Sequence, residues 1–164
     1  MTNSRYSGNT IGGDGMQVED IMTSNPVCAE PSTSLQQVAQ MMIDCDCGGI
    51  PVCERGTNRL VGFVTDRDIV CRILAKGMNP LEYTARDVMT TDLHTIRPTA
   101  SVDDVIHTME RFKVRRVPVT NERGEILGIV AQADLVRRAM PKQPEMTEEF
   151  EEALEEISEP KSAV

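Results

Sequence analysis

The chain has 164 residues, 40% hydrophobic and 26% charged, which suffices for a globular core and excludes a wholly disordered or collagen-like protein. Its net charge of -9 argues against nucleic acid or an anionic membrane as a partner. No apolar run reaches the ~18 residues of a membrane helix and the N-terminus lacks a secretory signal, so we expect a cytoplasmic protein.

A tandem duplication organises the chain. Residues 1–15 are rich in Gly, Ser, Asn and Thr and are expected to form a flexible tail. From there on, a shift of 67 residues places DIMT on DVMT and GIPV on RVPV. With one residue fewer in the second turn, GFVTDRD also falls on GIVAQAD. We therefore place repeat 1 at residues 16–78 and repeat 2 at residues 79–141.

Each repeat predicts the same order of elements. In repeat 1, Leu35, Val38 and Met42 recur at helical spacing behind Ser34, which predicts a capped amphipathic helix. Two β-rich runs, IPVCE and LVGFVT, follow as a hairpin. DRDIVCRILAKG then predicts a second helix that ends at Gly77. Repeat 2 has the same pattern over residues 101–114, 117–120, 126–130 and 133–140.

Two such repeats should pack against each other, because a unit of about 60 residues buries too little surface to be stable alone. We expect their sheets to meet around a pseudo-twofold axis. The last segment, residues 142–164, predicts an acidic helix or tail with a narrow apolar stripe of Met146, Phe150, Leu154 and Ile157. That helix either docks on its own chain or frays, or it binds a partner protein or a second copy.

No catalytic constellation is evident, because the only imidazoles, His94 and His107, belong to no metal or triad motif. We therefore expect a protein that is not an enzyme. The stretch GFVTDRD is more informative and has two interpretations. As a capping box, Thr65 and Asp68 satisfy only the backbone N–H groups at a helix start. As a ligand site, the helix start and the Thr65 hydroxyl attract a phosphate, while a carboxylate accepts hydrogen bonds from a ribose diol.

These repeated motifs, DIMT or DVMT, GGIPV or RRVPV, and GFVTDRDIV or GIVAQADLV, resemble those of a CBS (cystathionine β-synthase) domain pair, or Bateman module, from residue 18 to about 140. The resemblance implies a mixed α+β fold of two β-α-β-β-α units. It implies a regulatory module that binds AMP, ADP, ATP, NAD or S-adenosylmethionine and senses energy or metabolites in signal transduction. The chain is similar to stand-alone bacterial and archaeal CBS proteins, including hypoxic-response types. A homodimer, as a disk of four repeats, is also implied.

Carried over to this chain, the resemblance puts Thr65 toward the phosphate and Asp68 on the ribose, with Asp66 beside them. The adenine would lie against backbone and apolar atoms of Gly49, Ile50, Pro51 and Val52. Repeat 2 would complete this cleft with Thr91, Leu93, His94, Arg115 and Arg116. An arginine suits a phosphate because its guanidinium donates two parallel hydrogen bonds.

A second, weaker cleft is expected in repeat 2, because Ala131 stands in the place of Thr65 and has no hydroxyl. This cleft would bind weakly, bind a nucleoside portion only, or stay empty. Its residues would be Asn25, Val27, Cys28, Val117, Pro118 and Asp134.

The cysteines support a rival hypothesis. Five of them, an odd number confined to the first half, make a poor disulfide framework, so we expect reduced thiols at Cys28, Cys45, Cys47, Cys53 and Cys71. Cys45-x-Cys47, with Cys53 nearby, is a weak pattern for a thiol sensor or a metal site. A third possibility is a scaffold with vestigial clefts whose acidic C-terminal helix recruits a partner.

Overall fold

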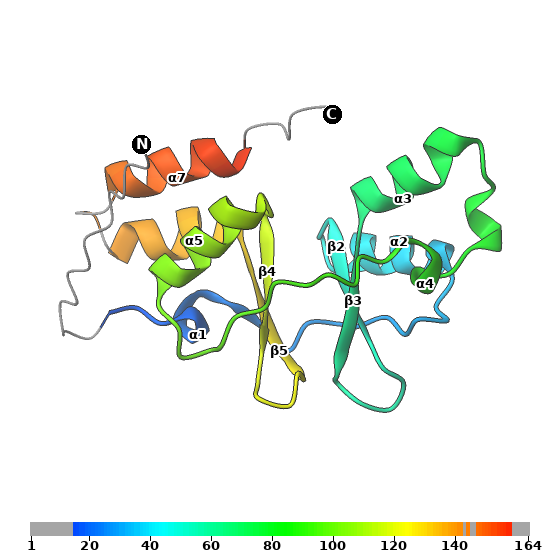
Figure 1. Cartoon of the computed structure of the whole chain (residues 1–164), viewed down its shortest axis with the longest axis horizontal. Helices are drawn as coiled ribbons and strands as arrows, with labels where there is room; N and C mark the ends of the chain where they lie inside the picture. Colours follow the sequence, from blue (N-terminus) through cyan, green and yellow to red (C-terminus); the bar gives the residue numbers. More distant parts are fainter. Residues whose placement is uncertain (1–14, 143, 145–146, 159–164) are drawn as a thin grey trace, which may run out of the picture.

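Two small sheets lie side by side at the middle of the molecule, and helices gather on its two flanks (Figure 1). The computed structural model describes residues 15–142, 144 and 147–158. One sheet has the strand order β1-β5-β4 and the other contains β2 and β3. The strands are β1 Thr23–Ser24, β2 Gly49–Cys53, β3 Leu60–Thr65, β4 Arg116–Thr120 and β5 Ile126–Ala131.

The helices are α1 Val18–Ile21, α2 Leu35–Asp44, α3 Asp66–Arg72, α4 Ala85–Val88, α5 Val102–Phe112, α6 Gln132–Asp134 and α7 Thr147–Ser158. Short 3-10 turns occur at Leu74–Lys76, Pro80–Glu82 and Met140–Lys142, and α6 continues as a π turn at Leu135–Ala139. The predicted mixed helix and strand fold is confirmed. Of the predicted N-terminal tail, all but Gly15 lies outside the described residues. In the part of the chain that is described, no helix combines the length and apolar character needed to cross a membrane.

Local capping explains where the long helices of the two repeats begin. The backbone N–H of Gln37 donates to Ser34 Oγ at 3.2 Å, and that of Asp104 donates to Ser101 Oγ at 3.1 Å. Both serines therefore satisfy N–H groups that have no partner inside the helix. The helix predicted after β3 ends earlier than expected, at Arg72, and a 3-10 turn carries the chain on to Gly77. Gly77 ends that turn with a φ of 70°, a conformation that suits glycine.

The two hairpins are equivalent in register, and each pairs with the first segment of the other repeat. Gly49 lies opposite Thr65 in the β2-β3 hairpin, as Arg116 lies opposite Ala131 in the β4-β5 hairpin. Strand β1 comes from the start of repeat 1 but pairs with β5 of repeat 2. Correspondingly, Thr90 from the start of repeat 2 pairs with Phe63 in β3. The repeats therefore exchange their first segments.

The same exchange builds both hydrophobic cores. Helix α1 buries Val18 and Ile21 among residues of repeat 2, while α4 buries Ala85 and Val88 among residues of repeat 1. The repeated methionine and glycine motifs meet across this exchange. A Cβ at Gly62 would overlap the Met89 side chain, and one at Gly128 would overlap Met22. Neither core is therefore complete without the other repeat.

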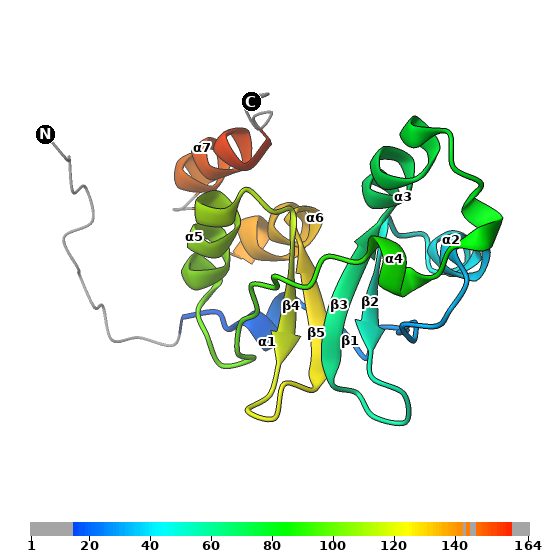
Figure 2. The same ribbon diagram turned by 45° about the vertical axis from the view of Figure 1, so that its right-hand side comes forward.

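Helix α7 packs on repeat 2 of its own chain (Figure 2). Phe150, Ala153 and Ile157 are buried in the repeat 2 core, and Leu154 is half-buried beside them. Met146, the first residue of the predicted stripe, lies outside the described residues. Among the alternatives predicted for residues 142–164, the structure shows that α7 docks on its own chain.

Candidate functional site

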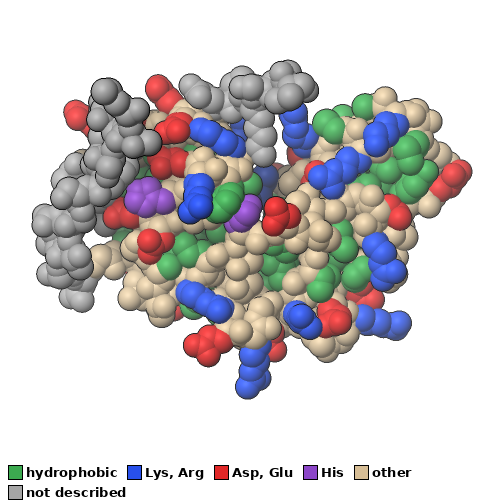
Figure 3. All heavy atoms as spheres, in the orientation of Figure 1, with side chains coloured by type: hydrophobic (Ala, Val, Ile, Leu, Met, Phe, Trp, Pro, Cys, Tyr) green, Lys and Arg blue, Asp and Glu red, His purple; other side chains and the backbone are tan. Residues whose placement is uncertain are grey.

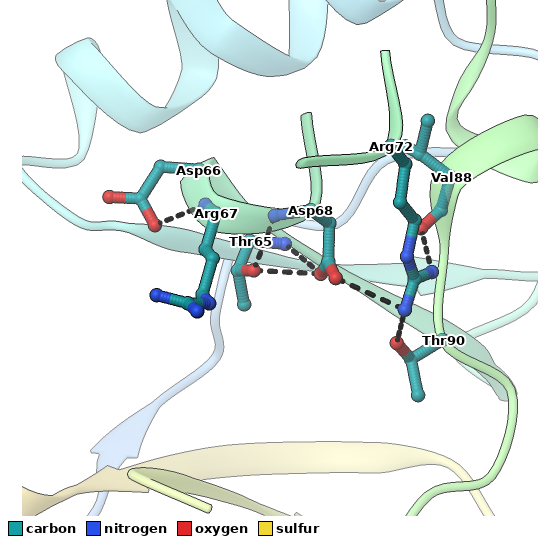
Figure 4. A network of polar contacts seen from close by, with 7 residues as sticks. All are labelled: Thr65, Asp66, Arg67, Asp68, Arg72, Val88 and Thr90. Carbon is teal, nitrogen blue, oxygen red and sulfur yellow. Dashed lines mark hydrogen bonds and ion pairs between the residues drawn. The ribbon is translucent and has the colours of Figure 1, made fainter. Parts of the chain in front are cut away.

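Thr65 and Asp68 form a complete capping box at the junction of β3 and α3 (Figure 4). The backbone N–H and the hydroxyl of Thr65 donate to Asp68 Oδ2 at 2.9 Å and 2.7 Å. In return, the backbone N–H of Asp68 donates to Thr65 Oγ1 at 3.1 Å. Thr65 and Asp68 therefore form the predicted capping box, which does not exclude a ligand at the same place.

The Asp68 carboxylate also connects α3 to the start of repeat 2. Its Oδ1 pairs with Arg72 Nη2 at 3.2 Å, and Arg72 donates to the carbonyl of Val88 and, at 3.0 Å, to Thr90 Oγ1 (Figure 4). A carboxylate accepts about four hydrogen bonds, and three of these positions are in use. The side chain keeps 16% of its surface exposed. It therefore retains room for an additional donor.

Arg116 of repeat 2 reaches across to the glycine pair of repeat 1. A Cβ at Gly48 would lie 3.0 Å from both Arg116 Nη2 and Asp66 Oδ2, and one at Gly49 would lie 3.4 Å from Arg116 Cδ. The missing side chains at these glycines thus leave space for the guanidinium. Asp66 follows Thr65 directly, and its Oδ1 accepts the backbone N–H of Arg67 at 2.7 Å. The structure therefore brings a cation of one repeat to the motif of the other.

The predicted adenine slot consists mostly of buried side chains. Ile50 and Val52, 2% and 0% exposed, belong to the repeat 1 core, and Gly49 and Pro51 are buried as well. A Cβ at Gly49 would overlap the ring of Phe63, only 2.6 Å from its Cε1. Sequence reasoning missed Phe63 and Gly48. The signal for Gly48 was present, because the doublet Gly48-Gly49 aligns with the doublet Arg115-Arg116 of repeat 2.

Other predicted residues of this cleft lie on the segment that crosses from repeat 1 to repeat 2 (Figure 1). Thr91 is exposed, while Leu93 and His94 are half-buried. The His94 ring stacks on Phe112, with 3.4 Å between ring centroids. Arg115 does not join Arg116 at the glycine pair of repeat 1. Its Nη2 instead donates to the carbonyl of Ser158 at the end of α7, at 3.4 Å.

In repeat 2 the corresponding network lacks the hydroxyl. The backbone N–H of Ala131 donates to Asp134 Oδ2 at 2.8 Å, and Asp134 Oδ1 pairs with Arg138 Nε at 3.5 Å. Arg138 in turn donates to the carbonyls of Ile21 and Met22, both at 2.9 Å. Gln132 turns to α7, where its Nε2 donates to the Leu154 carbonyl at 3.2 Å and to Ser158 Oγ at 2.9 Å.

The remaining residues predicted for the second cleft are spread out. Val117 is buried in the core, Val27 is 55% exposed, and the Pro118 carbonyl accepts the N–H of Ile96. Asn25 donates its N–H to the Leu127 carbonyl at 2.9 Å, with a φ of 51°. Cys28 contacts Cys53 of its own repeat. These contacts gather no polar side chains comparable to those around Thr65.

The Cys28 and Cys53 thiols lie close to each other, next to the bridge between Ala29 and Val52, and Cys28 Sγ donates to the Pro26 carbonyl at 3.5 Å. The contact with Cys53 lowers the pKa of Cys28 below its ordinary value. The same contact, together with burial, raises the pKa of Cys53. All five cysteines are free thiols. Among the described residues, no three His, Cys, Asp or Glu side chains come together to hold a metal ion, so Cys45 and Cys47 complete no such cluster there.

A cavity of about 390 Å³ lies elsewhere in the molecule. It is lined by Glu30, Pro31, Ser32, Glu54, Arg55, Val61, Arg86 and Met89. None of these residues was predicted from the sequence as a site residue. The cavity contains no part of the Thr65 and Asp68 network.

Comparison with known proteins identifies the duplicated unit. The sequence profile of the CBS domain matches residues 18–75 and again residues 85–140. Hypoxic response protein 1 of Mycobacterium tuberculosis is 37% identical over 118 residues, covering 72% of this chain and 81% of that protein. A crystal structure of hypoxic response protein I with two coordinated zinc ions has a TM-score of 0.67 at 36% identity, covering 75% of this chain and 98% of that one.

Two further structures are similar and hold adenosine compounds. The CBS domain pair of protein MJ0100, in complex with 5-methylthioadenosine and S-adenosyl-L-methionine, has a TM-score of 0.70 at 26% identity, covering 78% of this chain and 98% of that one. CBSX2 of Arabidopsis thaliana, in complex with AMP, has a TM-score of 0.67 at 26% identity, covering 79% of this chain and 99% of that one. The resemblance drawn from the repeated motifs is thus confirmed: this chain belongs to the CBS domain family and contains two copies of the domain.

Proposed function

We propose that this protein is a non-catalytic regulatory module that binds an adenine nucleotide between its two repeats. The observation that carries the proposal is the reach of Arg116 over Gly48 and Gly49 to the side of Asp66. A guanidinium there provides a donor pair for a phosphate, beside a carboxylate network suited to a ribose. The adenosine compounds held by two CBS-pair relatives support this ligand class.

Each side chain has a separate role in the proposed site. Asp68 accepts a ribose hydroxyl through its remaining acceptor position, and Arg116 binds the phosphate. Thr65 holds the Asp68 carboxylate in place through two hydrogen bonds. The adenine lies against backbone atoms near Gly49, because Ile50 and Val52 turn their side chains into the core.

Binding across two repeats gives a means of regulation. A ligand that contacts both Asp68 and Arg116 favours one relative arrangement of the repeats, to the extent that it binds that arrangement better. We infer that the protein senses energy or metabolite levels in this way, as a homodimer in the cytoplasm. The downstream partner is a separate protein that reads the arrangement of the repeats.

A thermal-shift panel tests the nucleotide proposal directly. The reduced protein is heated with AMP, ADP, ATP, NAD or S-adenosylmethionine, and with GMP as a control for the base. A ligand that binds only the folded chain stabilises it by about 2.7 kcal/mol at a hundredfold excess over its dissociation constant. We expect a shift with at least one adenosine compound and none with GMP. If Arg116 binds phosphate, Arg116→Gln reduces the shift with nucleotides more than that with S-adenosylmethionine. The absence of any adenosine-dependent shift would refute the proposal.

The Cys28–Cys53 contact favours a second candidate function, a thiol redox switch. The opposite pKa shifts of the two thiols favour Cys28 over Cys53 as the attacking group. It would attack an oxidised low-molecular-weight disulfide, forming a mixed disulfide and releasing one small thiolate. Cys53, after losing its proton to water, would displace the second small thiolate and close the Cys28–Cys53 bond. The closed bond would tie the segment before α2 to β2.

Intact-mass spectrometry after treatment with an oxidised small disulfide tests this switch. We expect the loss of two hydrogen atoms from the chain, with peptide mapping that joins Cys28 to Cys53. Cys71→Ser, at an exposed cysteine of the same repeat, should leave this product unchanged. Cys53→Ser should stop at the mixed disulfide on Cys28, and Cys28→Ser should form no bond to Cys53. An unchanged mass for the wild type, or a bond between other cysteines, would argue against the switch.

A further inference from the structure

The last turn of α7 lies at the place in repeat 2 that corresponds to the proposed ligand site of repeat 1. The backbone N–H of Asp66 donates to the Gly48 carbonyl at 3.2 Å. In the same way, the N–H of Gln132 donates to the Arg115 carbonyl at 2.9 Å. Gln132 and Arg115 are therefore the spatial counterparts of that pair. In repeat 1 an arginine side chain of the other repeat reaches this place, whereas in repeat 2 Ser158 of α7 lies there.

Three polar side chains of repeat 2 hold this last turn. Arg115 Nη2 donates to the Ser158 carbonyl at 3.4 Å, and Gln132 Nε2 donates to Ser158 Oγ at 2.9 Å. Lys113 Nζ donates to the Glu156 carbonyl at 2.9 Å and pairs with its carboxylate at 3.3 Å. Each of the three repeat 2 groups is a donor of the kind that a nucleotide needs. All three are engaged by α7 instead.

The carboxyl end of α7 resembles the anionic part of a nucleotide in its chemistry. The last four carbonyls of a helix have no partner within it, and the helix dipole adds a partial negative charge there. Ser158 is the last residue of α7, and its carbonyl accepts from the Arg115 guanidinium. Figure 3 shows Lys and Arg side chains between the two helical flanks, where they attract an anion despite the net charge of -9. The helix end is therefore suited to the place of an anionic group.

The last turn of α7 also has an apolar anchor of its own. Ile157 is 2% exposed and belongs to the repeat 2 core. Phe150 and Ala153, on the earlier turns of α7, are buried in the same core. A change confined to Ile157 can therefore release the last turn while the rest of the helix stays docked.

We propose that α7 closes the cleft of repeat 2, so that each chain binds one adenosine ligand, in repeat 1, and that release of the last turn opens a second site. This inference rests on the proposed nucleotide function and adds a regulation of it. Ala131 alone only weakens the second cleft, whereas α7 occupies it. Because the helix end and a ligand compete for the same donors, displacement of α7 and binding in repeat 2 favour each other.

Equilibrium dialysis of the full chain with AMP, ADP, ATP, NAD and S-adenosylmethionine counts the bound molecules. We expect one site on the wild-type chain. Ile157→Asn should release the last turn, because burying an unpaired amide is costly. It should add a second site about tenfold weaker than the first, since Ala131 has no hydroxyl. Ile157→Val keeps an apolar anchor and should leave one site. Adding Asp134→Ala to Ile157→Asn should remove the second site again.

Lys113→Glu provides a second way to release the turn, because the new carboxylate repels Glu156. It should give the same second site as Ile157→Asn. Hydrogen exchange of the last α7 turn shows whether each variant releases it, and thermal unfolding checks that the fold is retained.

Two sites on the wild-type chain would overturn the closure. A released turn with one site would also overturn it, while the nucleotide proposal would stand. Binding of these compounds to none of the chains would overturn both proposals.

Discussion

Replacing Asp68 by alanine is expected to lower the affinity for the adenosine ligand by roughly tenfold to a hundredfold. A hydrogen bond to a charged group contributes about 1.5–3 kcal/mol, and about 1.4 kcal/mol corresponds to a factor of ten. The carboxylate is the group that the proposed site offers to the ribose. Its loss also frees Arg72, whose guanidinium then keeps only its contacts with Val88 and Thr90. Isothermal titration calorimetry with the ligand selected by the panel measures the change.

Asp134→Ala is the matched control for this experiment. Asp134 accepts the N–H of Ala131 and pairs with Arg138, much as Asp68 accepts that of Thr65 and pairs with Arg72. Loss of either helix-start contact should cost about 0.5–2 kcal/mol of stability, which urea unfolding measures. Only Asp68→Ala should also lose ligand affinity. If Asp134→Ala weakens binding as strongly, the ligand occupies the cleft of repeat 2 instead.

Local parts of this site could be predicted from the sequence. A hydroxyl residue followed three positions later by a carboxylate specifies a capping box through contacts within one turn, and Thr65 and Asp68 form it. That Arg115 and Arg116 point in different directions could also be predicted in part. Because side chains alternate along a strand, Arg116 at the start of β4 points away from the face that buries Val117. It therefore turns toward the other repeat.

Contacts between distant segments could not be predicted in the same way. The exchange that places Val18 in the core of repeat 2 and Val88 in that of repeat 1 depends on how the two units pack, and no local pattern encodes it. Likewise, Arg115 was expected at the phosphate but contacts α7, which lies more than 30 residues along the chain. The Cys28–Cys53 contact arises because a parallel bridge brings Ala29 beside Val52.

Replacing Phe150 by alanine should destabilise the protein by about 3–5 kcal/mol, since a large side chain is deleted from a well-packed core. Phe150 is 1% exposed and belongs to the same buried cluster as Met109 and Leu135 of repeat 2. Its loss would leave a cavity and loosen α7. The partners of the last α7 turn, Lys113 and Arg115, would then lose their contacts with Glu156 and Ser158. The shift of the urea unfolding midpoint measures the change in stability.

Glu151→Ala, at an exposed position of the same helix, separates packing from helix propensity. This control should change stability by no more than about 0.5 kcal/mol, as is usual for surface positions. A loss below about 1 kcal/mol for Phe150→Ala would mean that α7 adds little to the repeat 2 core in solution. In that case α7 would leave the apolar residues of α5 and of the π turn after α6 open to solvent.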